Sequence, residues 1–89
     1  MTAADVLDRG RESFARQAWA DAYAQLSAAD QESPLEPEDL ERLATAAYLL
    51  GSDADSIDIW ARAHHEFLRR GDVERAARCA FWAGLRPAE

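Results

Sequence analysis

The chain has 89 residues, is rich in alanine, and contains only four glycines and three prolines, a composition that favours one all-α domain over a sheet. Its formal net charge of −7 opposes phosphate backbones and anionic lipid surfaces, so we expect neither nucleic acid nor a membrane among its partners. A single cysteine excludes an internal disulfide and a four-cysteine zinc site.

The first two helices are predicted from a cap, from apolar spacing and from prolines. Thr2 and Asp5 have the spacing of a capping box, so the first helix begins directly after Thr2, and its apolar stripe ends near Gln17. The second helix starts at Trp19 with apolar residues three and four positions apart. The segment SPLEP at 33–37 ends it and forces an extended connection.

The third and fourth helices are bounded by similar signals. Pro37 suits the first turn of the third helix, whose broad apolar face predicts that it is the most buried of all, and Gly51 suits its carboxyl-terminal cap. Ser52 and Asp55 repeat the capping-box spacing, and the fourth helix then continues to Gly71.

Charged residues mark the exposed side of the fourth helix and the start of a fifth. Residues four positions apart in the fourth helix are expected to form ion pairs, Asp58 with Arg62 and Glu66 with Arg70. Asp72 is expected to cap a fifth helix, which ends before the Arg-Pro pair at 86–87. The chain therefore reads as two helix pairs plus one further helix.

These helices fit the 34-residue period that is typical of helix-turn-helix repeat arrays. In a first unit that starts at residue 3, the patterned positions are Gly10, Trp19, Ala22, Leu26, Ala29 and Pro34. In a second unit that starts at residue 37, they are Leu40, Leu43, Ala44, Gly51, Ser56, Trp60 and Ala63. Small side chains at such positions let helices approach closely, and bulky ones fill the gaps between them.

On these positions the chain resembles the tetratricopeptide repeat family over residues 3–84. It departs from the family pattern with Gln17 at a turn where glycine is usual, and with Leu68 where the second unit would end in proline. The segments LEPEDLERLATAAYLLG and HEFLRRGDVERAARCAFWAGL are also similar to the helical-repeat region of LuxR-type transcriptional regulators of actinobacteria. That resemblance implies a regulatory interaction or sensing segment. It does not imply DNA binding, because these 89 residues contain no counterpart of the regulators' DNA-binding module.

Few side chains suggest catalysis or metal binding. His64 and His65 are adjacent and would point about 100° apart on a helix, and neither has a His or Cys four residues later. We expect His64 to be packed and His65 to be solvated. Cys79 follows Arg75 and Arg78, which would lower the pKa of its thiol, but it is best interpreted as a small packing residue. We expect no catalytic, cofactor-binding or metal-binding residue.

The resemblance places a partner-binding groove on the concave face that the first helices of successive units form. Its residues in this chain are Leu7, Arg11, Phe14, Glu41, Thr45, Tyr48, Arg78 and Phe81. The alternative is that these aromatic residues belong to the core. The last helix has no capping helix after it, so it either caps the array itself or self-associates through Trp82 and Leu85.

Charge is divided unevenly along the chain. Acids concentrate in residues 30–58 and arginines in residues 62–86. The division predicts either two solvated faces or contact of the acidic middle and the basic end with another copy or a charged partner.

The sequence as a whole predicts a TPR-like helical-repeat domain over residues 1–89 that acts as a non-catalytic, regulatory protein–protein interaction module. Its expected partner is a protein or peptide, with homodimerisation possible. The alternatives are a small-ligand sensor, for which a cavity among Phe14, Tyr48 and Trp60 would speak, a purely structural homo-oligomer, and a metal or thiol enzyme around the two histidines and the cysteine. An acidic amino terminus, the lack of a long apolar run and the use of arginine alone as the basic residue suggest the cytoplasm of a bacterium.

Overall fold

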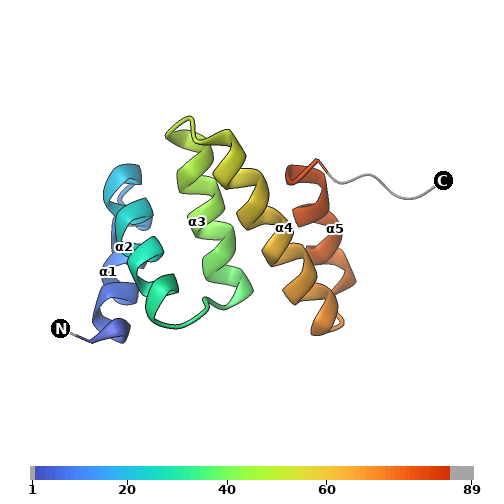
Figure 1. The fold of residues 1–89 in the computed structure, drawn as a ribbon, viewed down its shortest axis with the longest axis horizontal. Coiled ribbons are helices and arrows are strands. Elements are labelled where there is room, and N and C mark those ends of the chain that lie inside the picture. Colours follow the sequence, from blue (N-terminus) through green and yellow to red (C-terminus); the bar gives the residue numbers. More distant parts are fainter. Residues whose placement is uncertain (1, 85–89) are drawn as a thin grey trace.

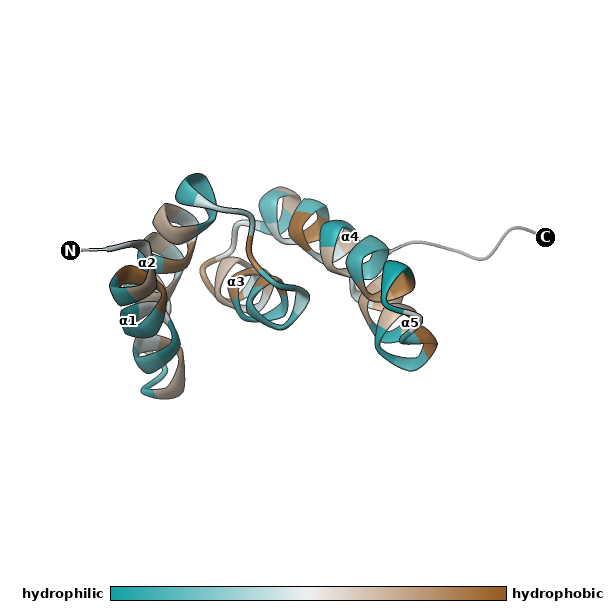
Figure 2. Ribbon diagram, turned by 90° about the horizontal axis from the view of Figure 1, so that it is seen from below, coloured by the Kyte–Doolittle hydropathy of each residue, from teal (hydrophilic) through white to brown (hydrophobic). Residues whose placement is uncertain are grey.

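The computed structural model describes residues 2–84, and this part of the chain is all-α (Figure 1). Its helices are α1 (Ala3–Ala15), α2 (Trp19–Glu32), α3 (Pro37–Leu49), α4 (Asp53–Arg69) and α5 (Val73–Trp82). Each helix packs against the next one along the chain, and α1 also contacts α3. Figure 2 shows α2 and α4 in one layer and α1, α3 and α5 in the other, with α3 set back between its two neighbours.

The predicted ends of most helices are confirmed. Thr2 accepts a hydrogen bond from the Asp5 amide and its own amide donates to the Asp5 carboxylate, which completes the capping box of α1. Pro37 occupies the first turn of α3, and Asp72 accepts from the Arg75 amide at the start of α5.

The turn between α1 and α2 has a backbone conformation that suits glycine, although Gln17 occupies it. Gln17 has φ of 63°, in the left-handed region that a side chain disfavours. Gly51 and Gly71 occupy the same region, with φ of 82° and 77°, in the two later turns. The three turns therefore share one conformation although only two of them use glycine.

Two local predictions are wrong. The side chain of Ser52 makes no capping hydrogen bond to α4, and Asp55 instead accepts from the Tyr23 hydroxyl on α2, 3.0 Å away. The two expected pairs along α4 are replaced by pairs with other partners: Arg62 with Asp30, Arg70 with Glu36 and Glu38, and Glu66 with Arg69. The pairs with Asp30, Glu36 and Glu38 form because α3 packs against both α2 and α4, which brings carboxylates of α2 and of the start of α3 within reach of the arginines of α4.

The core is built from small residues at the helix crossings. A Cβ atom at Gly10 would lie 2.8 Å from the side chain of Leu26, so α1 and α2 are in contact at that point. Residues buried in α2, α3, α4 and α5 form one cluster, whose members include Leu26, Ala29, Leu40, Leu43, Ala44, Trp60, Ala63, Phe67, Ala76 and Cys79. α3 has the most buried residues of the five helices, as its apolar face predicts.

Candidate functional site

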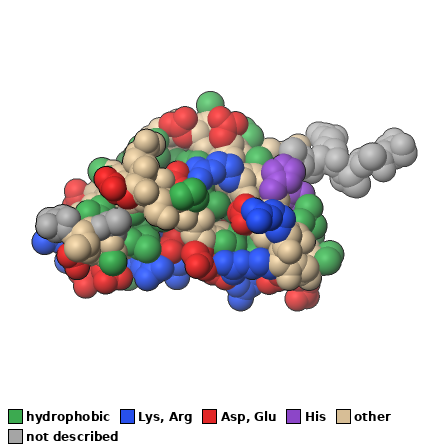
Figure 3. Space-filling view, turned by 60° about the horizontal axis from the view of Figure 1, so that its bottom comes forward, with side chains coloured by type: hydrophobic (Ala, Val, Ile, Leu, Met, Phe, Trp, Pro, Cys, Tyr) green, Lys and Arg blue, Asp and Glu red, His purple; other side chains and the backbone are tan. Residues whose placement is uncertain are grey.

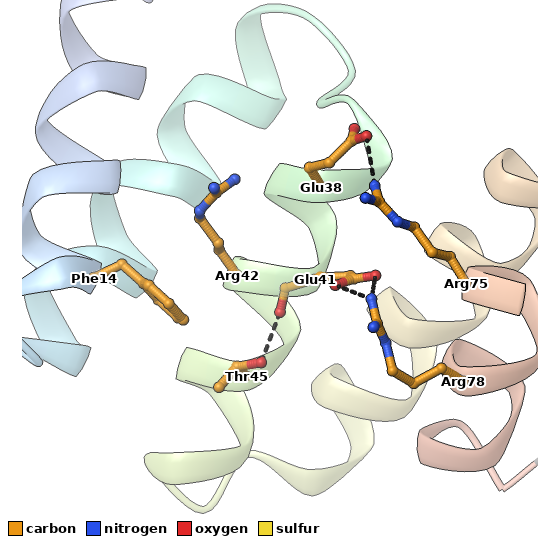
Figure 4. Close-up of a pocket in the computed structure, with 7 residues that line it drawn as sticks. All are labelled: Phe14, Glu38, Glu41, Arg42, Thr45, Arg75 and Arg78. Carbon is orange, nitrogen blue, oxygen red and sulfur yellow. Dashed lines mark hydrogen bonds and ion pairs between the residues drawn. The ribbon is translucent and has the colours of Figure 1, made fainter. Parts of the chain in front are cut away.

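The layer formed by α1, α3 and α5 contains a groove of about 330 Å³ (Figure 4). Its lining residues are Phe14 from α1, Glu38, Glu41, Arg42 and Thr45 from α3, and Arg75 and Arg78 from α5. The structure thus brings together four of the eight groove residues expected from the sequence: Phe14, Glu41, Thr45 and Arg78. It adds Glu38, Arg42 and Arg75. We term the groove lined by these seven residues the charged groove.

The other four expected groove residues lie elsewhere. Leu7 packs against the core, and Arg11 binds Asp39 beside the groove. Tyr48 borders a second hollow, and Phe81 is 76% exposed on α5. The alternative that these aromatics are core does not hold for Tyr48 or Phe81, because both are exposed.

Arginines of α5 hold the carboxylates of α3 across the charged groove. Arg78 Nη2 donates to both carboxylate oxygens of Glu41 at 2.8 and 3.1 Å, and Arg75 Nη1 donates to Glu38 Oε2 at 3.3 Å. Figure 4 shows these two pairs side by side, with the Thr45 hydroxyl bonded to the backbone carbonyl of Glu41. The α3–α5 side of the groove is therefore fixed by ion pairs.

The α1–α3 side is fixed by a buried carboxylate. Arg11 donates from Nε and Nη2 to the two oxygens of Asp39, at 2.9 and 2.7 Å, and Arg42 donates to the same group at 3.0 Å. Burial raises the pKa of Asp39, but the hydrogen bonds and charges of the two arginines outweigh that effect and hold the pKa below its usual value. Asp39 is thus a charged anchor that orients Arg42 along the groove.

The acidic middle and the basic end of the sequence therefore meet within one chain. Besides the pairs already described, Arg62 binds Asp30 through two hydrogen bonds of 2.8 and 2.9 Å between α4 and α2. Figure 3 shows red and blue side chains lying side by side over the face in view. These pairs join helices of the same chain; contact of the two regions with a second molecule stays a prediction.

A second, apolar hollow of about 150 Å³ shares Thr45 with the charged groove, and we term it the aromatic hollow. Its lining residues are Thr45, Tyr48, Trp60 and Trp82. The cavity expected among Phe14, Tyr48 and Trp60 thus exists with Trp82 in place of Phe14, which packs edge-on against Trp19 with ring centroids 5.3 Å apart. The sequence analysis did not place Trp82 in this hollow because it assigned Trp82 to a self-association surface.

Trp82 makes its main aromatic contacts within the chain. Its ring centroid lies 6.0 Å from that of Trp60 and 6.1 Å from that of Tyr48. Half of the residue remains exposed. Leu85, the other residue expected to mediate self-association, lies outside the described residues.

The single cysteine and the two histidines have structural surroundings. Burial, followed by the nearby carboxylate of Glu41, raises the pKa of the Cys79 thiol to about 12; the charge of Arg78 lowers it, as predicted, but is outweighed. Cys79 is fully buried, as expected of a packing residue. His64 Nδ1 lies 2.7 Å from the carbonyl oxygen of Ala76 and ties α4 to α5, while His65 is exposed, as predicted.

Within residues 2–84 the structure shows no group of three His, Cys, Asp or Glu side chains placed to hold a metal ion. In the same part of the chain no helix has the length and hydropathy of a membrane span. The chain matches no protein-family model, and comparisons with curated proteins and with solved structures gave no significant match.

Proposed function

We propose that this protein is a non-catalytic helical-repeat module that binds a peptide segment of a regulatory partner in the charged groove. The observation that carries the proposal is the groove itself, which is lined by one side of each of α1, α3 and α5 and is bordered by both an aromatic ring and guanidinium groups. Grooves of this kind accept extended or helical segments. The proposal keeps the tetratricopeptide-like reading of the sequence, with the bacterial cytoplasm as its place of action.

The charges of the groove favour an acidic peptide. Glu38 and Glu41 each receive hydrogen bonds from arginines, so their oxygens are already occupied. Each guanidinium has five N–H donors, more than these carboxylates use. Arg42 is the second arginine on Asp39 and lines the groove, so its remaining donors are suited to a carboxylate of the partner.

An apolar side chain next to that carboxylate would rest on Phe14. Phe14 is partly buried and lies across the groove from the arginines of α5 (Figure 4). We therefore expect the preferred peptide to carry an acidic residue close to a bulky apolar one.

Selection from a display library of random peptides tests this function. We expect enriched peptides to pair acidic with bulky apolar residues, and amide shifts in NMR titrations to map to residues of the charged groove. Arg42→Gln and Phe14→Ala should each weaken binding about tenfold or more. Arg69→Gln is the matched control, because Arg69 pairs only with Glu66 of its own helix within the described residues. Shifts that map away from the groove, or a library that yields no saturable binder, would refute the proposal.

Self-association through α5 is the second candidate, favoured by the exposure of Phe81. Phe81 is the most exposed of the large hydrophobic residues described, at 76%, and Val73 on the same helix is 69% exposed. Sedimentation equilibrium of the wild type and of Phe81→Asp over a range of concentrations tests it. A dimer that the substitution dissociates would support self-association, whereas a monomer at all concentrations would exclude it.

A further inference from the structure

The aromatic hollow draws its rings from three different helices. Tyr48 belongs to α3, Trp60 to α4 and Trp82 to α5, and all three line the same hollow of about 150 Å³. The Tyr48 and Trp82 rings meet at an interplanar angle of 64°, whereas those of Trp60 and Trp82 are inclined by 22°. Tyr48 and Trp82 are 54% and 48% exposed, so a ligand reaches the hollow from solvent.

Two helices end at this hollow and give it a negative field. Tyr48 lies in the last turn of α3 and Trp82 in the last turn of α5, and neither turn contains a basic residue. The carboxyl-terminal end of a helix carries a partial negative charge that attracts cations. α4 follows α3 directly, and Asp53 and Asp55 in its first turn offset the positive partial charge of its amino-terminal end.

The charge of Arg78, which lies one turn before Trp82 on α5, is already balanced by a carboxylate. Its guanidinium binds both oxygens of Glu41. Among residues 2–84, the lining of the hollow consists of Thr45 and three aromatic residues and includes no charged side chain. The chain as a whole carries −7, which also attracts cations.

We propose that the aromatic hollow binds a quaternary ammonium group, such as the trimethylammonium head of a choline-like compound. Aromatic faces attract such cations when the charge lies within about 6 Å of a ring centroid. The hollow is smaller than the roughly 300–1,000 Å³ of sites that take whole drug-sized ligands, so it suits a compact head group. The proposal gives the ligand-sensor alternative a chemical class, and it does not rest on peptide binding in the charged groove.

The test compares choline with its uncharged isostere 3,3-dimethylbutan-1-ol, in which carbon replaces the charged nitrogen. NMR titrations of the protein follow the indole N–H signals of Trp60 and Trp82, with that of Trp19 as an internal reference outside the hollow. We expect saturable shifts of the two hollow tryptophans with choline and binding at least about tenfold weaker with the isostere. Equal binding of the two compounds would make the hollow a simple apolar pocket and overturn the proposal, as would the absence of saturable binding of choline.

Variants at Tyr48 separate the aromatic contribution from folding. Tyr48 is half exposed, so Tyr48→Leu and Tyr48→Phe should both fold, which circular dichroism checks. We expect Tyr48→Phe to retain choline binding and Tyr48→Leu to lose it about tenfold. Leu68→Ala, an exposed apolar residue of α4 outside the hollow, should bind like the wild type. Unchanged affinity in Tyr48→Leu would refute a role for the ring.

Discussion

Arg11 and Asp39 join the first helix to the third through two parallel hydrogen bonds, although 28 residues separate them in the sequence. Asp39 is 1% exposed, and the Arg11 side chain is about half exposed. A buried carboxylate without a cation is costly, so this pair decides how α1 sits against α3.

We predict that Arg11→Gln lowers the free energy of unfolding by about 1–2 kcal/mol. The loss is smaller than that for a fully buried pair, because Arg11 is partly solvated and Arg42 still binds Asp39. Urea denaturation measures it, with Arg9→Gln as control, since Arg9 is exposed and forms no ion pair with any described side chain. Equal losses in the two variants would show that the contact contributes nothing specific.

Acid should destabilise the protein through Asp30 and Asp39. Two hydrogen bonds from Arg62 lower the pKa of Asp30, burial opposes them, and the Leu35 amide adds to the lowering. Because the folded pKa values of Asp30 and Asp39 lie below the unfolded ones, their contribution is complete above about pH 4 and disappears as the pH falls through the folded values.

We therefore expect the free energy of unfolding in urea to fall as the pH drops below about 4, and to fall less steeply in Asp30→Asn. The exposed Glu12, changed to Gln, serves as control for the loss of one acid. An Asp30→Asn protein with the same pH dependence as the wild type would contradict the assignment.

Gly10→Ala should destabilise the protein even though alanine favours helices. The added methyl would lie 2.8 Å from Leu26, and we expect a net loss of about 1–3 kcal/mol. Thermal denaturation of Gly10→Ala, Leu26→Val and the double variant measures the coupling. The double variant should be more stable than the sum of the two losses allows. A Gly10→Ala protein that gains stability would show that the helices are not in close contact at this crossing.

Cys79 should resist thiol reagents in the folded protein. The rise of its pKa from 9.0 to about 12 lowers the thiolate population about a thousandfold near pH 8, and burial slows reaction further. We expect slow reaction with 5,5′-dithiobis(2-nitrobenzoate) in buffer, rapid reaction in urea, and faster reaction in Glu41→Gln, which removes a nearby negative charge. Glu66→Gln, on another face, should react like the wild type. Native protein that reacts as fast as the unfolded chain would disprove the buried, neutral thiol.

Signals that act between near neighbours in the sequence predicted the fold. The cap at Thr2, the proline at 37 and the small residues at the crossings depend on backbone geometry and on apolar spacing, both of which a sequence displays directly. The resemblance to tetratricopeptide repeats, rather than the spacing alone, placed Phe14, Glu41, Thr45 and Arg78 in the groove. Glu38 precedes Glu41 by three residues and Arg42 precedes Thr45 by three, spacings that share one side of a helix, so helical spacing could have found them too.

The sequence did not predict the individual ion pairs between residues that are far apart in the chain. An arginine on a helix has a neighbour four residues away and another across the helix interface, and only the packing decides between them. Arg62 takes Asp30 rather than Asp58 because α2 brings a partly buried carboxylate within 2.8 Å of it. Trp82 likewise meets Trp60 and Tyr48 because α5 folds back onto α4, which its own sequence does not reveal.

The ion pairs that join neighbouring helix pairs respond to salt differently from the apolar core. Apolar side chains of α2, α3, α4 and α5 form one core that runs through the helix pairs, and arginine–carboxylate pairs with partly exposed guanidinium groups also join one helix pair to the next. Dissolved ions weaken exposed charge pairs much more than buried apolar contacts. We therefore expect rising ionic strength to weaken these exposed pairs before it weakens the core, so that salt loosens the contacts between helix pairs while the helix content stays constant.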